Sequence, residues 1–244
     1  MSGSKILVGF DGSEGSQDAF ELGRLLGAIL DAPVEAHDAA NGRPARELVE
    51  EAGRVEAGTL VVGSPHRGPV GRALLGSVAE HVLHHSPCEV LVAPRGYAEA
   101  EHSGLRRVAV AYDGTRESKA ALRRAEELAR AAGASIEIIV AEDPVVSGLE
   151  AETPPAPPVL AADLLAAAID SVDPALSPTG RRIDPGWRQV VRTIATGLAQ
   201  ACEPDVDLLV AGSRRPLDRF FLGSVTKHLI VEAPCPVLVV PEPE

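Results

Sequence analysis

The sequence has few aromatic residues and no long apolar run. Aromatic side chains make up 3% of the 244 residues although 45% are hydrophobic, so the core must consist of small aliphatic side chains, as in helices packed on a parallel sheet. No run approaches the ~20 apolar residues of a membrane helix, and the run after Lys5 is too short for a signal peptide. With 24% charged residues, this composition excludes disordered, collagen-like and disulfide-scaffold chains.

Basic residues and cysteines are also scarce. The 23 Lys and Arg face 35 Asp and Glu, which gives a net charge of −12. Such a surface repels nucleic acid and anionic lipid, so no nucleic-acid or membrane partner is expected. The three cysteines, Cys88, Cys202 and Cys235, have no CxxC spacing, which excludes a zinc ribbon and indicates a reducing compartment. We therefore expect a soluble, cytoplasmic protein.

The chain contains an internal repeat with four landmarks in the same order in both copies. The landmarks of the first copy are residues 6–13, 60–64, 75–78 and 86–92, and those of the second copy are residues 108–115, 209–213, 222–225 and 233–239. Four matched landmarks in one order exceed what similar composition would produce. The sequence therefore predicts two related domains, at residues 1–97 and 104–244, with a boundary at 94–104.

The spacing of the landmarks shows where the two copies differ. Asp11 and Asp113 are 102 positions apart, whereas Gly63 and Gly212 are 149 apart. The first copy is therefore 47 residues shorter between these landmarks, about the size of one β-α unit with its turns. At the third landmark the offset falls to 147, so there the second copy is two residues shorter.

Each copy is predicted to alternate short buried strands with helices. Strand-helix-strand order with short connections implies parallel strands and right-handed crossovers, and hence an α/β fold. Strands are expected directly before Asp11 and Asp113, at 136–140, before the two later Gly-Ser pairs, and as closing strands at 90–93 and 237–240. Helices are expected at about 19–30, 48–52, 77–85, 121–132, 159–170 and 190–198, with a Pro-rich loop at 153–158. The helix at 77–85 is expected to open with a capping box at Ser77 and Glu80.

The chemistry is expected at the carboxyl ends of the strands, where open parallel sheets bind ligands. Asp11 and Asp113 stand one residue past a first strand in each copy. A Gly-Ser pair at a helix start supplies free N–H groups, a hydroxyl and the positive end of the helix dipole, which suits phosphate. The candidate ligand contacts are Asp11, Gly63, Gly76 and Ser77 in the first copy and Asp113, Gly212, Gly223 and Ser224 in the second.

Together, the strand-Asp-Gly-Ser start, the later Gly-Ser loop, Leu-Gly-Ser-Val and Pro-Cys-x-Val-Leu-Val resemble the universal stress protein family over nearly the whole chain. The resemblance implies two flavodoxin-like, Rossmann-like domains of the adenine nucleotide alpha hydrolase-like type. It implies that their closing strands pair to form an intramolecular pseudo-dimer, and a further homodimer stays open. ATP-binding members use a loop of the form G-x2-G-x9-G-[S/T], and their Asp after the first strand contacts the nucleoside end. ATP, with Mg²⁺, is therefore the cofactor that the resemblance implies.

Both copies depart from the family's loop pattern. In the first copy, Gly63, Gly76 and Ser77 match, but His66 replaces the second glycine and Gly68 follows two residues later. The shorter first copy also lacks a strand and helix that would wall an adenine site. In the second copy, the loop 213–222 is two residues short and has no internal glycine; its Arg214 and Arg215 either reach a phosphate or form a solvated turn. If only one copy binds, we expect it to be the first.

A cluster of His81, His84, His85 and Cys88 suits either of two interpretations. Spacings of three and four place the histidines on one helical face, as in a metal site. Alternatively, histidines are favoured at a helix C-terminus by the dipole, and the cysteine leads a buried strand. The second copy does not repeat the cluster, and we assign no metal ligand.

Cys88 and Cys235 are matched and expected to pack against the core, with redox sensing as the alternative. Cys202 has no partner, since no cysteine of the first copy matches it.

Three functions remain. The chain is a stress-response module that binds an adenine nucleotide, or a nucleotide-free scaffold whose sites are degenerate and whose partner is another protein, or a slow ATP hydrolase that uses a site aspartate and Mg²⁺. The sequence contains no G-x-S-x-G elbow, HExxH motif or Walker P-loop. No catalytic residue is therefore assigned, and hydrolysis is the least favoured of the three.

Overall fold

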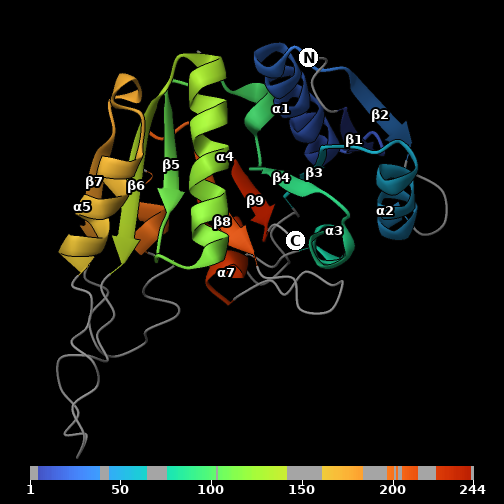
Figure 1. Cartoon of the computed structure of the whole chain (residues 1–244). Coiled ribbons are helices and arrows are strands. Elements are labelled where there is room, and N and C mark those ends of the chain that lie inside the picture. Colours follow the sequence, from blue (N-terminus) through green and yellow to red (C-terminus); the bar gives the residue numbers. More distant parts are fainter. Residues whose placement is uncertain are drawn as a thin grey trace, which may run out of the picture.

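The protein is described by a computed structural model that covers residues 5–38, 44–64, 76–102, 104–141, 161–183, 197–200, 202, 205–213 and 224–242. Its centre is one sheet of nine strands with helices on both faces (Figure 1). None of the helices within these ranges is long and apolar enough to span a membrane. The proline-rich segment 153–158 lies outside the described residues, as do Gly68, His66, Arg214, Arg215 and Gly223.

The first half (residues 1–97) and the second half (residues 104–244) both begin with a strand, a helix and a strand and both end with a strand, a helix and a closing strand. The first half contains β1 (Ile6–Phe10), α1 (Glu14–Leu30), β2 (Val34–Asp38), α2 (Pro44–Arg54), β3 (Thr59–Gly63), α3 (Ser77–His85) and β4 (Glu89–Ala93), followed by the 3-10 helix η1 (Tyr97–Glu99). The second half contains β5 (Arg107–Ala111), α4 (Arg116–Ala132), β6 (Ser135–Ala141), α5 (Ala161–Ser171), η3 (Pro174–Leu176), β7 (Thr179–Ile183), β8 (Leu208–Ser213), α7 (Ser224–Glu232) and β9 (Val237–Pro241). The repeat in the sequence is thus a repeat of structure.

The strand order is β2-β1-β3-β4-β9-β8-β5-β6-β7. All neighbouring strands are parallel except β4 and β9, which pair antiparallel. The expected pairing of the closing strands is therefore confirmed. Counted from its own first strand, the second half has the order 3-2-1-4-5, which is the Rossmann-type arrangement. The first half has the same order without its outermost strand.

The helices form two layers, each above its own apolar core. Helices α1, α4 and α5 cover one face, over a core that includes Val8, Val61, Val108 and Val210. Helices α2, α3 and α7 cover the other face, over a core that includes Leu7, Leu60, Leu209 and Val239. Alternate residues of each central strand thus enter opposite cores, which is why these strands are apolar throughout. Both cores contain residues of both halves, so the halves share their interior.

The unit that the first half lacks is α5 with β7. In the second half β7 pairs with β6, and residues 138–140 of β6 (Ile-Ile-Val) are buried. In the first half β2 is an edge strand, and its matched residues 36–38 are Ala-His-Asp. Beside them, Glu35 accepts a hydrogen bond from Lys5 Nζ at 2.8 Å. The polar residues of β2 therefore follow from the missing unit, because an edge strand faces water.

Most of the predicted elements within the described residues agree with the structure, and two details were wrong; of the helix expected at 190–198, residues 190–196 lie outside the described residues. Neither β2 nor β7 was expected as a separate strand. The helix at 77–85 has its expected bounds, but its N-cap is Gly76, so Ser77 and Glu80 form no capping box. Within the boundary segment 94–104, η1 packs on α1 and Tyr97 is buried within the core.

The connecting segment is held by the side chain of Asp18. This carboxylate is only 2% exposed, and it accepts hydrogen bonds from the backbone N–H groups of Gly96 at 3.0 Å and Ala98 at 2.7 Å. Tyr97 lies between these two residues and stacks on His102 with ring centroids 3.6 Å apart. Burial, followed by the charges of Asp207 and Glu21, raises the pKa of Tyr97 to about 12. The chain therefore leaves the first half as an ordered segment, residues 95–102, which we call the strap.

Two matched glycines permit close approach of strand and helix. A Cβ on Gly63, at the end of β3, would lie 2.1 Å from the carbonyl oxygen of Gly15 in α1. A Cβ on Gly212, at the end of β8, would lie 2.5 Å from the backbone carbonyl group of Glu117 in α4. Glu117 is the residue of the second half that matches Gly15. Both glycines were predicted for their access to a ligand. The structure shows that each is required by the packing of its own half.

We predict that Gly63→Ala and Gly212→Ala each lower the free energy of unfolding by about 3 kcal/mol or more, because backbone atoms on both sides of the contact must shift. Urea denaturation of the full chain measures the loss. Gly53→Ala in α2 is the matched control, since among the described residues its Cβ would meet Pro87 alone, at 4.0 Å. It should raise stability by about 0.5–1 kcal/mol through helix propensity. Equal effects at all three positions would contradict the close-approach argument.

We further predict that Asp18→Asn weakens the strap. The new amide would present a donor to an N–H donor in a buried place, which costs about 1–3 kcal/mol. Hydrogen exchange should show faster exchange at the amides of Gly96 and Ala98. Glu99→Gln, an exposed carboxylate in the same segment, should leave these amides protected. Unchanged exchange in Asp18→Asn would show that the carboxylate does not hold the segment.

Candidate functional site

A pocket of about 280 Å³ lies at the carboxyl ends of β1 and β3 in the first half. The end of β1 contributes Phe10 and Asp11, and the start of α1 contributes Ser13 and Ser16. The remaining described lining residues come from β1 and α1 (Gly9, Gly15), from α2 (Pro44, Leu48), from the end of β3 (Val62, Gly63, Ser64) and from the start of α3 (Gly76, Ser77, Val78, Ala79). The structure thus brings together four of the predicted ligand contacts: Asp11, Gly63, Gly76 and Ser77.

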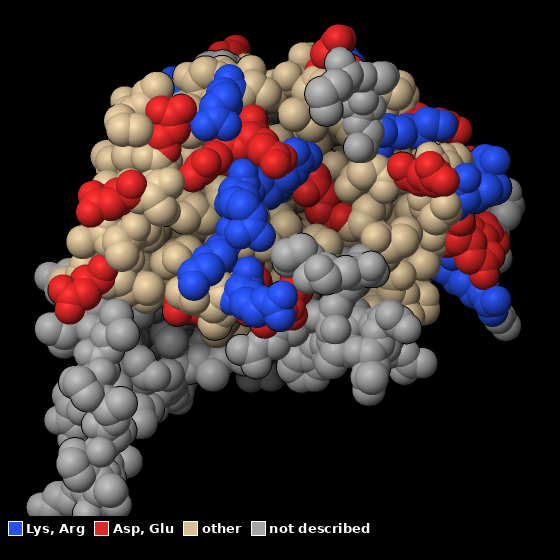
Figure 2. Space-filling model, viewed as in Figure 1, with Lys and Arg blue, Asp and Glu red and all other residues tan. Residues whose placement is uncertain are grey.

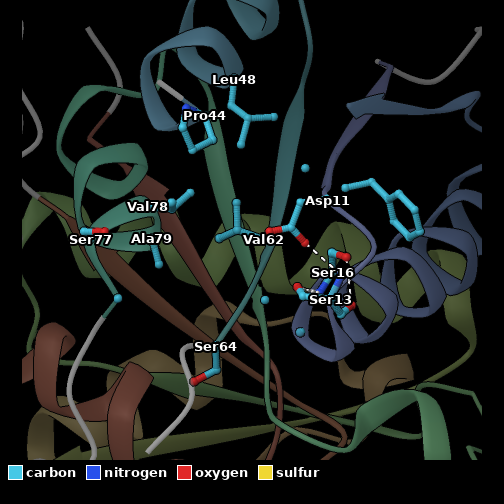
Figure 3. Close-up of a pocket in the computed structure, with 15 residues that line it drawn as sticks. Asp11, Ser13, Ser16, Pro44, Leu48, Val62, Ser64, Ser77, Val78 and Ala79 are labelled. Atoms are coloured by element: carbon cyan, nitrogen blue, oxygen red, sulfur yellow. Dashed lines mark hydrogen bonds between the residues drawn. The ribbon is translucent and has the colours of Figure 1, made fainter. Parts of the chain in front are cut away.

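Asp11 and the start of α3 lie on opposite sides of this pocket. Figure 3 shows Asp11 facing Val62, with Ser77 and Val78 beyond it and Pro44 and Leu48 above. The distance between the two sides is bridged by apolar side chains from β3 and α2. The pocket therefore has an acidic side, an apolar wall and a helix N-terminus.

Hydrogen bonds fix the position and the charge of Asp11. Its Oδ1 accepts a hydrogen bond from the Ser13 N–H at 3.0 Å, across Gly12 in the left-handed region at φ 81°. Ser13 in turn caps α1, since its Oγ accepts from the N–H of Ser16 at 3.3 Å. Hydrogen bonds from the Ser13 side chain and backbone hold the pKa of Asp11 below its usual value, although partial burial opposes this. Asp11 is therefore ionised at neutral pH.

The start of α3 offers N–H groups instead of charge. Its N-cap, Gly76, makes no side-chain capping hydrogen bond, and the first bond within the helix runs from the Glu80 N–H to the Gly76 carbonyl at 2.8 Å. The N–H groups of the first turn, at Ser77, Val78 and Ala79, point along the helix axis toward its N-terminus. Because the helix dipole adds a partial positive charge there, this side of the pocket suits an anion.

The second half repeats the turn that follows the first strand, but there a side chain of α5 lies over the turn. Asp113 Oδ1 accepts hydrogen bonds from the Thr115 N–H at 3.0 Å and the Thr115 hydroxyl at 2.6 Å, and Thr115 caps α4. A Cβ on Gly114 would lie 2.8 Å from Leu164 of α5, whereas no atom of the described residues lies within 4 Å of the same position on Gly12. Helix α5, which the first half lacks, therefore covers the turn of the second half. Gly212 ends β8 nearby, Ser224 begins α7, and Gly223 lies outside the described residues.

The histidine cluster at the end of α3 shows no metal site. His81 and His85 stack with ring centroids 4.2 Å apart, and His85 Nδ1 bonds to the His81 carbonyl oxygen at 2.9 Å. Partial burial and the neighbouring His85 and His84 lower the pKa of His81. Within the described residues, which include all three histidines and Cys88, no group of three or more His, Cys, Asp or Glu could hold a metal ion.

The cysteines pack as expected, with one exception. Cys235 is buried in the core beneath α7, and Cys88 lies partly buried against the same core. The exception is Cys202, which has no matched cysteine in the first copy: a contact with its thiol, followed by burial, raises the pKa of the Cys235 thiol. These residues are 33 positions apart in the sequence, and both are buried in the same apolar core.

Comparisons with known proteins agree with this arrangement. The model of the universal stress protein family matches residues 24–94 and 104–241. Universal stress proteins of Mycobacterium bovis and Mycobacterium tuberculosis are each 32% identical over 236 residues, which cover 91% of this chain and 78% of the relative. A universal stress protein structure from Archaeoglobus fulgidus has a TM-score of 0.67 at 18% identity, with 100% of both chains covered. A putative universal stress protein from Pseudomonas aeruginosa has a TM-score of 0.60 at 15% identity, with 98% of this chain and 93% of that chain covered.

The two matched segments correspond to the two halves of the sheet, and their separation at residues 95–103 coincides with the strap between β4 and β5. Pairwise identity extends over most of both mycobacterial relatives and does not stop at one half. The chain belongs to the universal stress protein family.

Proposed function

We propose that the first half binds an adenine nucleotide, with its phosphates at the start of α3 and its nucleoside end toward Asp11. The observation that carries the proposal is the pocket itself, which joins Asp11, Gly63, Gly76 and Ser77 across elements far apart in the chain. The family's ATP-binding members use residues of these types at these places in their motif. The orientation follows from charge. An ionised Asp11 repels phosphate but accepts hydrogen bonds from hydroxyl or amino groups.

The described residues fit a nucleotide and offer little to a metal ion alone. The described residues enclose a cavity of about 280 Å³, just below the range of small-molecule sites, which starts at roughly 300 Å³. Asp11 is the single ionisable side chain among the described residues that line it. Mg²⁺ would therefore be held mainly by the phosphates, as is usual for this ion, and would neutralise their charge when bound.

Binding is favoured over hydrolysis by the same residue. A general base works best when its pKa lies near the operating pH. The pKa of Asp11 lies below the ordinary range of an aspartate, so this carboxylate is a weak base. Phosphate release above that of a chain with Asp11→Asn and Asp113→Asn would be needed to support the hydrolase. A nucleotide-free scaffold is the function that remains if no nucleotide binds.

Calorimetric titration of the nucleotide-stripped full chain with Mg-ATP tests the proposal. We expect micromolar binding in the wild type and loss of roughly a hundredfold or more in Gly76→Asp, because two like charges about 4 Å apart repel by about 4 kcal/mol near a protein surface. Aspartate is itself a good N-cap, so this variant should remain folded. Gly223→Asp, the matched change in the second half, should leave the affinity unchanged.

Thermal unfolding with and without ATP is a second test of the same proposal. ATP at 100 times its Kd should stabilise the wild type by roughly 2.7 kcal/mol. The absence of both heat and thermal shift at millimolar ATP would reject the nucleotide and favour the scaffold. Loss of binding in Gly223→Asp but not in Gly76→Asp would move the site to the second half.

The ionised state of Asp11 has its own test. Because its pKa is depressed in the folded chain, its contribution to stability is present above the unfolded pKa of about 3.8 and is lost as the pH falls through the folded value. Asp11→Asn should therefore lower the free energy of unfolding at pH 7 by less than about 1 kcal/mol, since solvent screens the exposed carboxylate. Urea denaturation from pH 7 to pH 3 should show this difference shrink below about pH 4. A difference independent of pH would contradict the assignment.

A further inference from the structure

The two halves meet around a local twofold axis. In the antiparallel β4–β9 ladder, Leu91 lies opposite Leu238, flanked by the pairs Val90–Val239 and Val92–Val237. Leu91 and Leu238 are matched residues of the repeat, at the offset of 147 that also relates Ser77 to Ser224. A residue near this axis therefore faces its own counterpart in the other half. If the halves were identical, every charge at the axis would face a like charge.

Helices α3 and α7 show how the chain avoids this repulsion. Both have nine residues and begin at matched serines. Glu80 of α3 and Lys227 of α7 are also matched residues, and they form an ion pair with each other across the axis. Two copies of the first half would place Glu80 against Glu80, and two copies of the second half would place Lys227 against Lys227.

A buried ion pair joins the halves on the other face of the sheet. Glu89, at the start of β4, accepts hydrogen bonds from Arg124 Nε at 2.8 Å and Nη2 at 2.7 Å. The Glu89 side chain is 10% exposed and that of Arg124 is 21% exposed. Thr59 donates a further hydrogen bond to Glu89 at 2.6 Å. This pair exists on one side of the axis only, because the matched residues on the other side are Pro236 and Leu22.

Each half would lose the Glu89–Arg124 pair if it paired with itself, although Arg124 would keep its hydrogen bond to Glu127 of α4 at 2.9 Å. Glu89 of one first half would meet Leu22 of the other, and Arg124 of one second half would meet Pro236 of the other. Removing one partner of a buried pair is strongly destabilising, because the remaining charge is out of water and uncompensated. Pairing of two first halves is therefore the more unfavourable, because Glu89 would keep no cation, whereas Arg124 of a second half would keep Glu127.

The helices that meet above the seam add a third difference. Figure 2 shows Lys and Arg side chains gathered in a band down the middle of this face, where Figure 1 places α4. On α4 an exposed row at spacings of three and four consists of Arg116, Lys119 and Arg123, and its matched row on α1 is Glu14, Gln17 and Glu21. Helices α1 and α4 contact each other in the chain. Two second halves would instead bring two basic rows and no acidic row to this face of the sheet.

We propose that the β4–β9 seam is specific for unlike halves: it fits a first half to a second half and rejects a second copy of either. The specificity resides in Glu80–Lys227 and in Glu89–Arg124, with Glu89–Arg124 the stronger element because it is buried. Apolar pairing of β4 with β9 supplies attraction without preference, since Leu91 and Leu238 are identical in kind. The second half is thereby the dedicated partner of the shorter first half.

In the intact chain the strap keeps the two halves together whatever their preference. Cutting the strap after folding allows the preference for unlike halves to be measured. A protease site inserted after Glu101, an exposed residue, allows cleavage once the chain has folded. The cleaved protein is unfolded in urea, refolded by dilution and examined by native mass spectrometry. We expect one-to-one complexes of unlike halves alone. A statistical mixture of like and unlike pairs, or pairs of like halves, would overturn the proposal.

A mutant cycle in the uncut chain tests the buried pair without any need for the halves to refold. Arg124→Leu, which copies the matched Leu22, should reduce the folding equilibrium constant by roughly a hundredfold or more, because Glu89 is left unpaired. Glu89→Leu combined with Arg124→Leu should recover most of this loss. Arg123→Leu, the exposed neighbour, is the control and should change the constant little. Glu89→Leu alone completes the cycle. If the losses in Arg124→Leu and Glu89→Leu simply multiply in the double variant, the pair does not discriminate and the proposal fails.

Discussion

The antiparallel ladder between β4 and β9 is the contact on which the rest of the molecule depends. Each half alone would end its sheet at a strand of almost continuous apolar residues, Val90–Val92 or Val237–Val239, with an open row of backbone hydrogen-bonding groups. Pairing the two closes both edges at once and continues the apolar layers on either face from one half into the other. The order of all nine strands then follows from the order within each half.

That contact also explains how the first half tolerates the loss of a whole β-α unit. The loss is at the outer edge of the sheet, away from the seam, and it exposes β2 where the second half covers β6 with β7. The exposed strand has polar residues in place of isoleucine and valine, so the new edge is suited to water. The same loss leaves the turn after β1 open, whereas Leu164 of α5 lies over the matching turn of the second half. Truncation and accessibility of the candidate site thus have one cause.

The candidate site could be predicted in part. Its residues come from turns after strands and from the start of a helix, and those positions are evident from local patterns such as Asp-Gly-Ser and Gly-Ser. Their meeting in one pocket followed from the rule that parallel strands present their carboxyl ends together. The participation of Pro44 and Leu48 was not foreseen, because α2 reaches the pocket through its packing on α3 and through Leu48 beside Gly9 of β1. The predicted role of Gly63 was also incomplete, since its contact with Gly15 depends on how closely α1 packs on β3.

The sequence by itself determined the repeat, the alternation of strands and helices, most element positions and the family resemblance, because each of these is expressed in short apolar runs, helical spacing and turn residues. It did not reveal β2 or β7, whose polar or glycine-containing stretches form strands only because a neighbouring strand pairs with them. Tertiary structure alone decided the strap held by Asp18, the meeting of Cys202 with Cys235, and the buried pair of Glu89 with Arg124. These contacts join residues 33 to 80 positions apart, and a local pattern contains no information about which distant side chain will complete a charge or a hydrogen bond.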